Sequence, residues 1–212
     1  MRLRRAALVL ALGVGVLAGA AAVDVVAEAA WRQQVVATSH GDPQALARRL
    51  LAGATPAPHC GTDDATDLGR LLSAIVIVED FAHSRAWKLA EATLVRALSL
   101  AGAPIPDLTL GDGEIRPSTA QRAGAGDGPA LPLRLLDPCD SRQIGVAVLA
   151  WIAREHGLAN RPLDHAAIVA IAAAYNGQGA PHEPAQLLAN ATYDEVVYDL
   201  YYGLAFRDLA LE

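Results

Sequence analysis

The chain has 212 residues, of which 53% are hydrophobic and 19% are charged, and its formal net charge is −6. This composition excludes an intrinsically disordered chain. The acidic balance, with no basic run after the first few residues, argues against a nucleic-acid partner. Aromatic residues make up only 5% of the sequence, and the prevalence of alanine and leucine favours helices packed through small side chains over a β-sandwich.

The first 23 residues have the layout of a secretory signal. They read MRLRRAALVLALGVGVLAGAAAV, in which three arginines precede an apolar run over residues 6–23. The run is also long enough for an uncleaved membrane anchor. Both interpretations place the rest of the chain in the periplasm or outside the cell, with membrane contact only through residues 6–23. A buried N-terminal helix is the alternative, and it leaves the arginine cluster without a purpose.

The sequence contains two cysteines, Cys60 in PHCGT and Cys139 in DPCDS. Each lies in a loop-like stretch before an expected helix. An even, low count in an exported protein predicts one disulfide. Two free thiols are the alternative. A metal site at Cys60 and the neighbouring His59 is disfavoured because the chain has no CxxC motif, so we expect neither a metal nor a cofactor.

The periodicity of the remaining sequence predicts an all-α protein with one irregular or short extended segment. We expect an N-terminal helical extension and linker over residues 24–58, with an amphipathic helix over 24–52, followed by a main domain over residues 59–212. The main domain should begin with a long helix from an N-cap at Asp67, with a kink or break near His83–Arg85, followed by an extended piece at 108–110 and a short helix from Ser118. A further helix should have Ser141 near its N-cap and Gly157 past its end. The last two should be a helix capped by Asp164 and ended by Asn176-Gly177, and a helix over 192–210.

One carboxylate continues an apolar stripe. Leu68, Leu72, Ile75 and Glu79 are spaced by four, three and four residues, which places them along one helix face. A carboxyl group in apolar surroundings holds its proton more readily than in water, as the general acid of a glycosidase must. The alternative is that Glu79 lies at a helix edge and pairs with His83 one turn later. A charged His83 would favour the ionised carboxylate, so the two interpretations conflict.

Three blocks resemble those of one enzyme family. GDGEIRPSTA at 111–120 resembles the Gly-Leu-Met-Gln-Ile-Met-Pro-Ser-Thr-Ala segment of lytic transglycosylases and goose-type lysozymes, and AAYNGQG at 173–179 resembles their Ala-Ala-Tyr-Asn-Ala-Gly segment. Upstream, VED at 78–80 stands where the family's catalytic glutamate follows an apolar helical run. The blocks occur in the family's order, and the resemblance covers about half of the chain.

This resemblance implies an all-α, lysozyme-like fold around a groove that binds the glycan strands of peptidoglycan. It implies that Glu79 is the single acid and base, which protonates the glycosidic oxygen, while the substrate's acetamido group and 6-hydroxyl complete a lytic transglycosylation. By the same resemblance, Gly111 and Glu114 line the groove, Tyr175 holds the Glu79 carboxyl, and Asn176 contacts sugar.

The chain also departs from the family pattern. Glu114 replaces a glutamine, Asp112-Gly113 replaces Leu-Met, and Asp80 replaces a serine. We expect Glu114 to face Glu79 across the groove, where it either adds a negative charge beside the acid or activates a water as the second carboxylate of a hydrolytic muramidase. Alternatively, Glu114 caps the following helix or points at solvent. A further alternative for the whole chain is a non-catalytic protein of the cell envelope that binds glycan or scaffolds partners.

Overall fold

The computed structural model describes residues 25–54, 60, 66–159, 161–177 and 193–209. The predicted signal or anchor at residues 1–23 lies outside this part. The described residues confirm the all-α prediction, since the one extended feature among them is an isolated antiparallel bridge between Leu110 and Ile115. None of the described helices is both long and apolar enough to span a bilayer.

The N-terminal region, predicted to be helical over residues 24–52, forms two helices with a break between them that was not predicted. The first covers residues 25–39, and α2 covers Pro43–Gly53. Asp42 caps α2 by accepting a hydrogen bond from the backbone N–H of Gln44. A proline lacks an N–H and is tolerated in the first helical turn but not in a helix interior, which explains why the chain breaks before α2.

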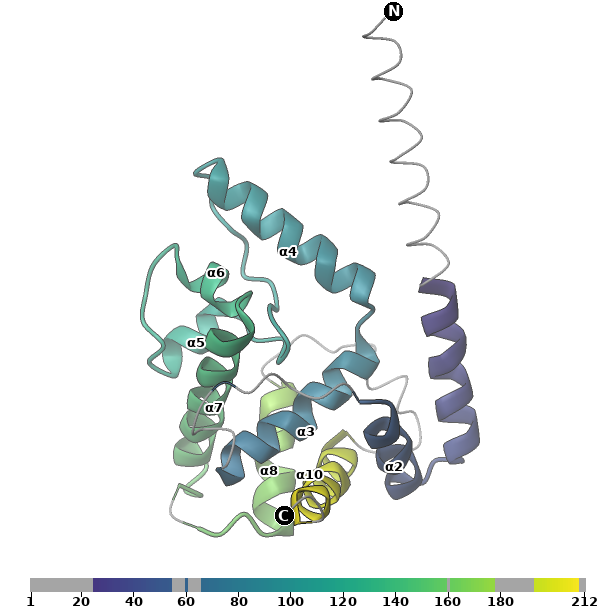
Figure 1. Cartoon of the computed structure of the whole chain (residues 1–212). Helices are drawn as coiled ribbons and strands as arrows, with labels where there is room; N and C mark the ends of the chain where they lie inside the picture. The colour runs from purple at the N-terminus through teal and green to yellow at the C-terminus, as the bar shows by residue number, and fades with distance from the viewer. Residues whose placement is uncertain (1–24, 55–59, 61–65, 160, 178–192, 210–212) are drawn as a thin grey trace, which may run out of the picture.

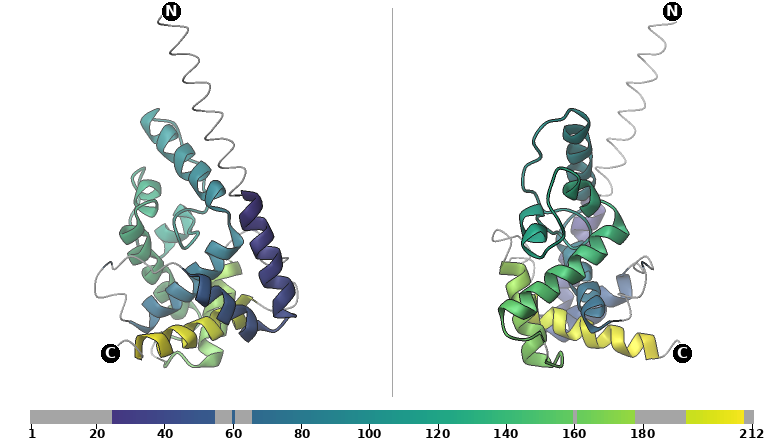
Figure 2. Two further views of the ribbon diagram at one scale, coloured as in Figure 1. Left: turned by 45° about the vertical axis from the view of Figure 1, so that its right-hand side comes forward. Right: turned by 90° about the vertical axis from the view of Figure 1, so that its left-hand side faces the viewer.

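The predicted break in the long helix is confirmed. α3 covers Asp67–Ala82 and α4 covers Arg85–Leu100, and the Ser84 side chain caps α4. The N-cap of α3 is Thr66, whose hydroxyl accepts from the backbone N–H of Gly69, so the expected cap at Asp67 is displaced by one residue. Figure 1 and both views of Figure 2 show that α4 projects from the other helices, at the end opposite α10.

The later helices follow the predicted order with small shifts at their ends. They are α5 (Pro117–Arg122), α6 (Leu131–Leu135), α7 (Pro138–Glu155), α8 (His165–Gly177) and α10 (Tyr193–Leu209). The cap of α7 is Asp137 and not Ser141, whereas Asp164 caps α8 as expected. The short α6 was not predicted, because a five-residue helix carries too little periodicity to be detected.

A single hydrophobic core joins the two ends of the described chain. α10 packs on α2, α3 and α8, and α3 also packs on α7. Val35, Leu46 and Leu50, from the expected N-terminal extension, belong to the same core cluster as Ile75 and Leu200. The helices before residue 58 are therefore an integral part of the packing that supports α3.

The predicted disulfide is present. Cys60 and Cys139 are bonded, with their Cα atoms 5.1 Å apart and 79 positions apart in the sequence. The bond ties the segment before α3 to the first turn of α7.

Candidate active site

Glu79 lies in the last turn of α3 and is 6% exposed. Leu72 and Ile75 of its stripe are buried with it, which confirms the predicted inward face. The Tyr193 hydroxyl donates to Glu79 Oε1 at 2.8 Å, and His83 Nδ1 lies 3.6 Å from Glu79 Oε2. Both carboxyl oxygens therefore have a polar neighbour, although the group is in the interior.

The turn that carries Glu114 is shaped by unusual backbone angles. The Leu110–Ile115 bridge closes it, and Gly111 has a φ of 74°. A Cβ on Gly111 would lie 2.2 Å from the Leu135 carbonyl oxygen, so only glycine fits. Glu114 itself has a φ of 52°, a conformation that costs a non-glycine residue about 1–3 kcal/mol. Strain of this kind persists where the surrounding structure enforces it, and here it accompanies a buried carboxylate.

The Glu114 side chain is 5% exposed, so it does not point at solvent. Nor does it cap α5, because the backbone N–H and hydroxyl of Ser118 donate to Asp107. Both of these alternatives for Glu114 are wrong. Glu114 Oε1 lies 3.5 Å from Lys88 Nζ and 3.9 Å from His83 Nδ1. Neither Glu114 oxygen has a hydrogen-bond partner within the described part of the chain.

Glu114 also lines a small pocket. Its walls come from the turn, α5, α7 and α8: Thr109, Glu114, Ile115, Arg116, Thr119, Val148 and Tyr175. Glu79 is not among these residues, and both Glu114 carboxyl oxygens are buried. The pocket therefore lies next to Glu114, on the side of α5, α7 and α8.

Lys88 joins α4 to this cluster. Its Nζ lies 2.7 Å from Asp80 Oδ1 and 3.5 Å from both Glu114 Oε1 and the Asp112 carbonyl oxygen. Burial lowers the pKa of Lys88, but the nearby carboxylates of Asp80 and Glu114 raise it more, so that it lies above 10.5. Burial and the Asp80 charge also raise the pKa of Asp112. Lys88 therefore remains a cation that connects α4 to Asp80 of α3 and to the turn that carries Asp112 and Glu114.

The expected role of Tyr175 needs a correction. The Tyr175 hydroxyl donates to the Gly113 carbonyl oxygen at 2.5 Å, and Tyr193 holds Glu79 instead. A Cβ on Gly113 would lie 2.9 Å from the Tyr175 hydroxyl, so the glycine makes room for it. Burial, and then the Glu79 charge, raise the pKa of both phenols well above 10. Both tyrosines therefore keep their protons and act as donors.

The other two predicted substrate residues are Asn176 on α8 and Gly111 in the turn. Asn176 is partly exposed near the end of α8. The α-carbon of Gly111 is packed against Leu135 and Ser141, on the side of α6 and α7. Their contacts with sugar stay predictions.

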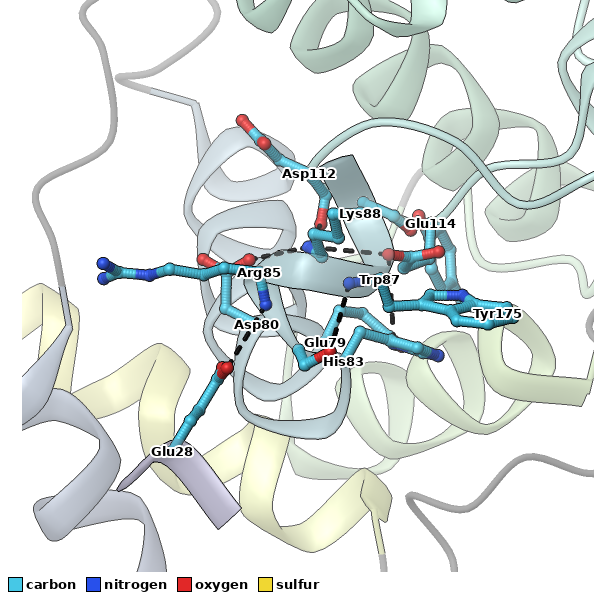
Figure 3. A network of polar contacts seen from close by, with 12 residues as sticks. Glu28, Glu79, Asp80, His83, Arg85, Trp87, Lys88, Asp112, Glu114 and Tyr175 are labelled. Carbon is cyan, nitrogen blue, oxygen red and sulfur yellow. Dashed lines mark hydrogen bonds and ion pairs between the residues drawn. The ribbon is translucent and has the colours of Figure 1, made fainter. Parts of the chain in front are cut away.

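Figure 3 shows Glu79, His83, Lys88, Glu114 and Tyr175 gathered around the junction of α3 and α4. Sequence reasoning singled out both glutamates and noted His83 as a neighbour of Glu79. It missed Tyr193 and Lys88 as site residues, since neither lies in a block that resembles the family. The described residues contain no cluster of His, Cys, Asp or Glu that could hold a metal ion.

A scan against protein-family models and searches of curated proteins and of solved structures found no match to this chain. The features of this chain that bear on its function are therefore the three sequence blocks and the polar cluster around Glu79 and Glu114.

Proposed function

We propose that the protein cleaves the glycan strands of peptidoglycan by lytic transglycosylation, with Glu79 as general acid and base in a lysozyme-like domain. The observation that carries this proposal is the meeting of three distant sequence blocks. Glu79 and Glu114 both lie beside His83, and Tyr175 bonds to the Gly113 carbonyl within the turn. The blocks that resemble the family thus come together around the carboxyl group that the resemblance marks as the acid.

The reaction needs one carboxyl group from the protein. Glu79 gives a proton to the glycosidic oxygen as the bond from that oxygen to C1 breaks, and the electron pair stays with the leaving oxygen. The acetamido oxygen of the same sugar stabilises C1. The 6-hydroxyl oxygen then bonds to C1 and returns its proton to Glu79, which gives a 1,6-anhydro product and restores the acid.

The surroundings of Glu114 support this reaction over hydrolysis. A second carboxylate that activates water must have room for that water between itself and the sugar. Glu114 Oε1 instead faces Lys88 and His83, and the side chain is almost fully buried. We therefore propose that Glu114 acts as a charged group beside Glu79 and does not activate a water. Its contact with sugar stays a prediction, and a hydrolytic muramidase is the alternative that product analysis decides.

The proposed location is the periplasm or the cell exterior, where peptidoglycan lies. The N-terminal sequence supports export. The Cys60–Cys139 bond also fits an oxidising compartment, although one disulfide is weak support by itself.

The test is product analysis on purified peptidoglycan. We expect anhydro-muropeptides from the wild type and a loss of turnover by orders of magnitude in Glu79→Gln, with the fold and glycan binding retained. Glu155→Gln, at the exposed end of α7, is the matched control and keeps full activity. Near-normal activity of a folded Glu79→Gln protein contradicts the mechanism. Products with reducing ends instead of anhydro ends indicate the muramidase.

A non-catalytic envelope protein is the second candidate, and α4 is the observation that favours it. Large apolar side chains on this helix are exposed, namely Trp87 by 57%, Leu89 by 65%, Leu94 by 45% and Leu100 by 90%. At helical spacing, Trp87 and Leu94 share one side of α4, and Leu89 and Leu100 lie on the opposite side. Exposed apolar side chains gathered on one projecting helix are an area that another protein can bind. Glycan binding by the wild type without any cleavage product would favour this candidate.

A further inference from the structure

His83 occupies the two-residue break between α3 and α4, and its imidazole faces two carboxylates. Nδ1 lies 3.6 Å from Glu79 Oε2 and 3.9 Å from Glu114 Oε1. The side chain is 17% exposed. One glutamate comes from α3 and the other from the turn before α5, so a single ring nitrogen connects two separate elements of the site.

The charged and titratable groups around His83 come from every element packed there. Glu79 lies on α3, Glu114 on the turn, and Lys88 and Glu91 on α4. Tyr193 of α10 donates to the other oxygen of Glu79. The polar contact with Glu79, at 3.6 Å, raises the pKa of His83, burial lowers it, and the Glu114 and Glu79 charges raise it. The Lys88 charge lowers it, and the net result is a pKa raised from the ordinary value of a histidine.

The same contacts bear on how Glu79 is supplied with its proton. A general acid must receive a new proton for each turnover, and the groups that contact the Glu79 carboxyl are the Tyr193 hydroxyl, which donates to Oε1, and the His83 ring, which lies beside Oε2. Two carboxylates beside one imidazole form a coupled system, in which a proton belongs to the group of residues and not to one of them. The proton that the reaction needs is therefore available one contact away from Glu79.

We infer that His83 is a positioning residue that stores the catalytic proton, and that it shares this proton with Glu79 and Glu114 as one titrating unit. This inference deepens the proposed function and depends on it for the role in turnover. The proton moves from His83 Nδ1 to Glu79 Oε2 when Glu79 protonates the leaving oxygen. It returns to the unit when the 6-hydroxyl bonds to C1, so that protons and electron pairs balance over the cycle.

The coupling is tested without any activity measurement, by NMR titration of the His83 ring in the full chain. Glu79→Gln removes the largest cause of the raised pKa and Glu114→Gln a smaller one. We expect the His83 midpoint to fall in both variants, and further in Glu79→Gln. The exposed His156 is the internal reference. An unchanged His83 midpoint in the folded variants overturns the inference, and Glu114→Gln alone decides if Glu79→Gln does not fold.

The role in turnover is tested with His83→Gln, which keeps a polar side chain but cannot store a proton. We expect the alkaline limb of the pH–rate profile to move to lower pH, with the KM for glycan strands unchanged. An equal loss of rate at every pH, without movement of the limb, indicates a structural role and overturns the inference. If the wild type releases no products, the proposed function fails, whereas the NMR titration still decides the coupling.

Discussion

The consecutive helices α3 and α4 have the same length, 16 residues, but opposite relations to the core. Nine residues of α3 are buried, whereas Val95 is the only one in α4. α3 crosses the interior and carries Glu79 in its last turn. α4 projects from the body and delivers Lys88 from near its start (Figures 1 and 3). α3 thus contributes far more to core packing than α4, whereas both helices contribute a charged residue to the site.

This difference decides which variants are informative. A substitution on the inner face of α3 changes the fold and the site together, because Glu79 shares that face with core residues. A substitution on α4 can change the charge beside Glu114 with little effect on packing. The predictions below test whether this division holds.

The largest effect is expected from a cavity beneath Glu79. Ile75 is fully buried one turn before Glu79, so Ile75→Ala should lower the free energy of unfolding by about 2–5 kcal/mol. The matched change on α4, Leu89→Ala, removes a side chain that is 65% exposed and should change it by less than about 0.5 kcal/mol. Urea denaturation measures both. Similar losses in the two variants would show that α4 is packed as firmly as α3.

The next largest loss of stability is expected on removal of the disulfide, because the bond ties the segment before α3 to α7. Replacing Cys60 and Cys139 together by serine should lower the free energy of unfolding by about 2–4 kcal/mol, mainly by freeing the unfolded chain. Denaturant curves of oxidised wild type and the double variant measure the loss. Thiol titration of denatured, unreduced wild type should find no reactive thiol, and two reactive thiols would refute the bond.

Removing the hydroxyl of either buried tyrosine should have a smaller effect on stability, and the size of the loss should differ between the two. Tyr193→Phe removes a donor from a buried carboxylate and should cost about 1–3 kcal/mol. Tyr175→Phe removes a donor from a neutral backbone carbonyl and should cost about 0.5–1.5 kcal/mol. Thermal or urea unfolding near neutral pH compares them. A larger loss in Tyr175→Phe would contradict the assignment of Tyr193 as the residue that holds Glu79.

The last prediction concerns Lys88 on α4, which lies beside the buried Glu114. Lys88→Met removes ion pairs with Asp80 and Glu114 and leaves the buried Glu114 carboxylate without that cation, so the cost should be about 1–3 kcal/mol near neutral pH. Because the folded pKa of Lys88 is raised, its contribution is complete below pH 10.5 and is lost as the pH rises through the folded value. The difference between wild type and variant, measured by urea unfolding, should therefore shrink above pH 10.5. A difference in unfolding free energy that grows above pH 10.5 would contradict a raised pKa of Lys88 in the folded protein.

The sequence by itself determined the features that depend on neighbouring residues. Apolar spacing along one helix predicted the inward face that carries Glu79, and cap and breaker residues predicted the break at His83–Arg85. The cysteine count predicted the bond between Cys60 and Cys139. These patterns are local or compositional, so one chain is enough to reveal them. The break before α2 was missed although its cause, a proline after a capping aspartate, is also local.

Only the tertiary structure decided how the site is assembled. Tyr193 and not Tyr175 holds Glu79, across 114 positions of sequence, and Lys88 and His83 both face Glu114 from the α3–α4 junction. No periodicity encodes these pairings, because they depend on how α3, α10 and the Glu114 turn pack around the shared core. A buried carboxylate must find its partners among whatever groups that packing brings within a few ångströms, and for Glu79 and Glu114 those groups come from distant segments.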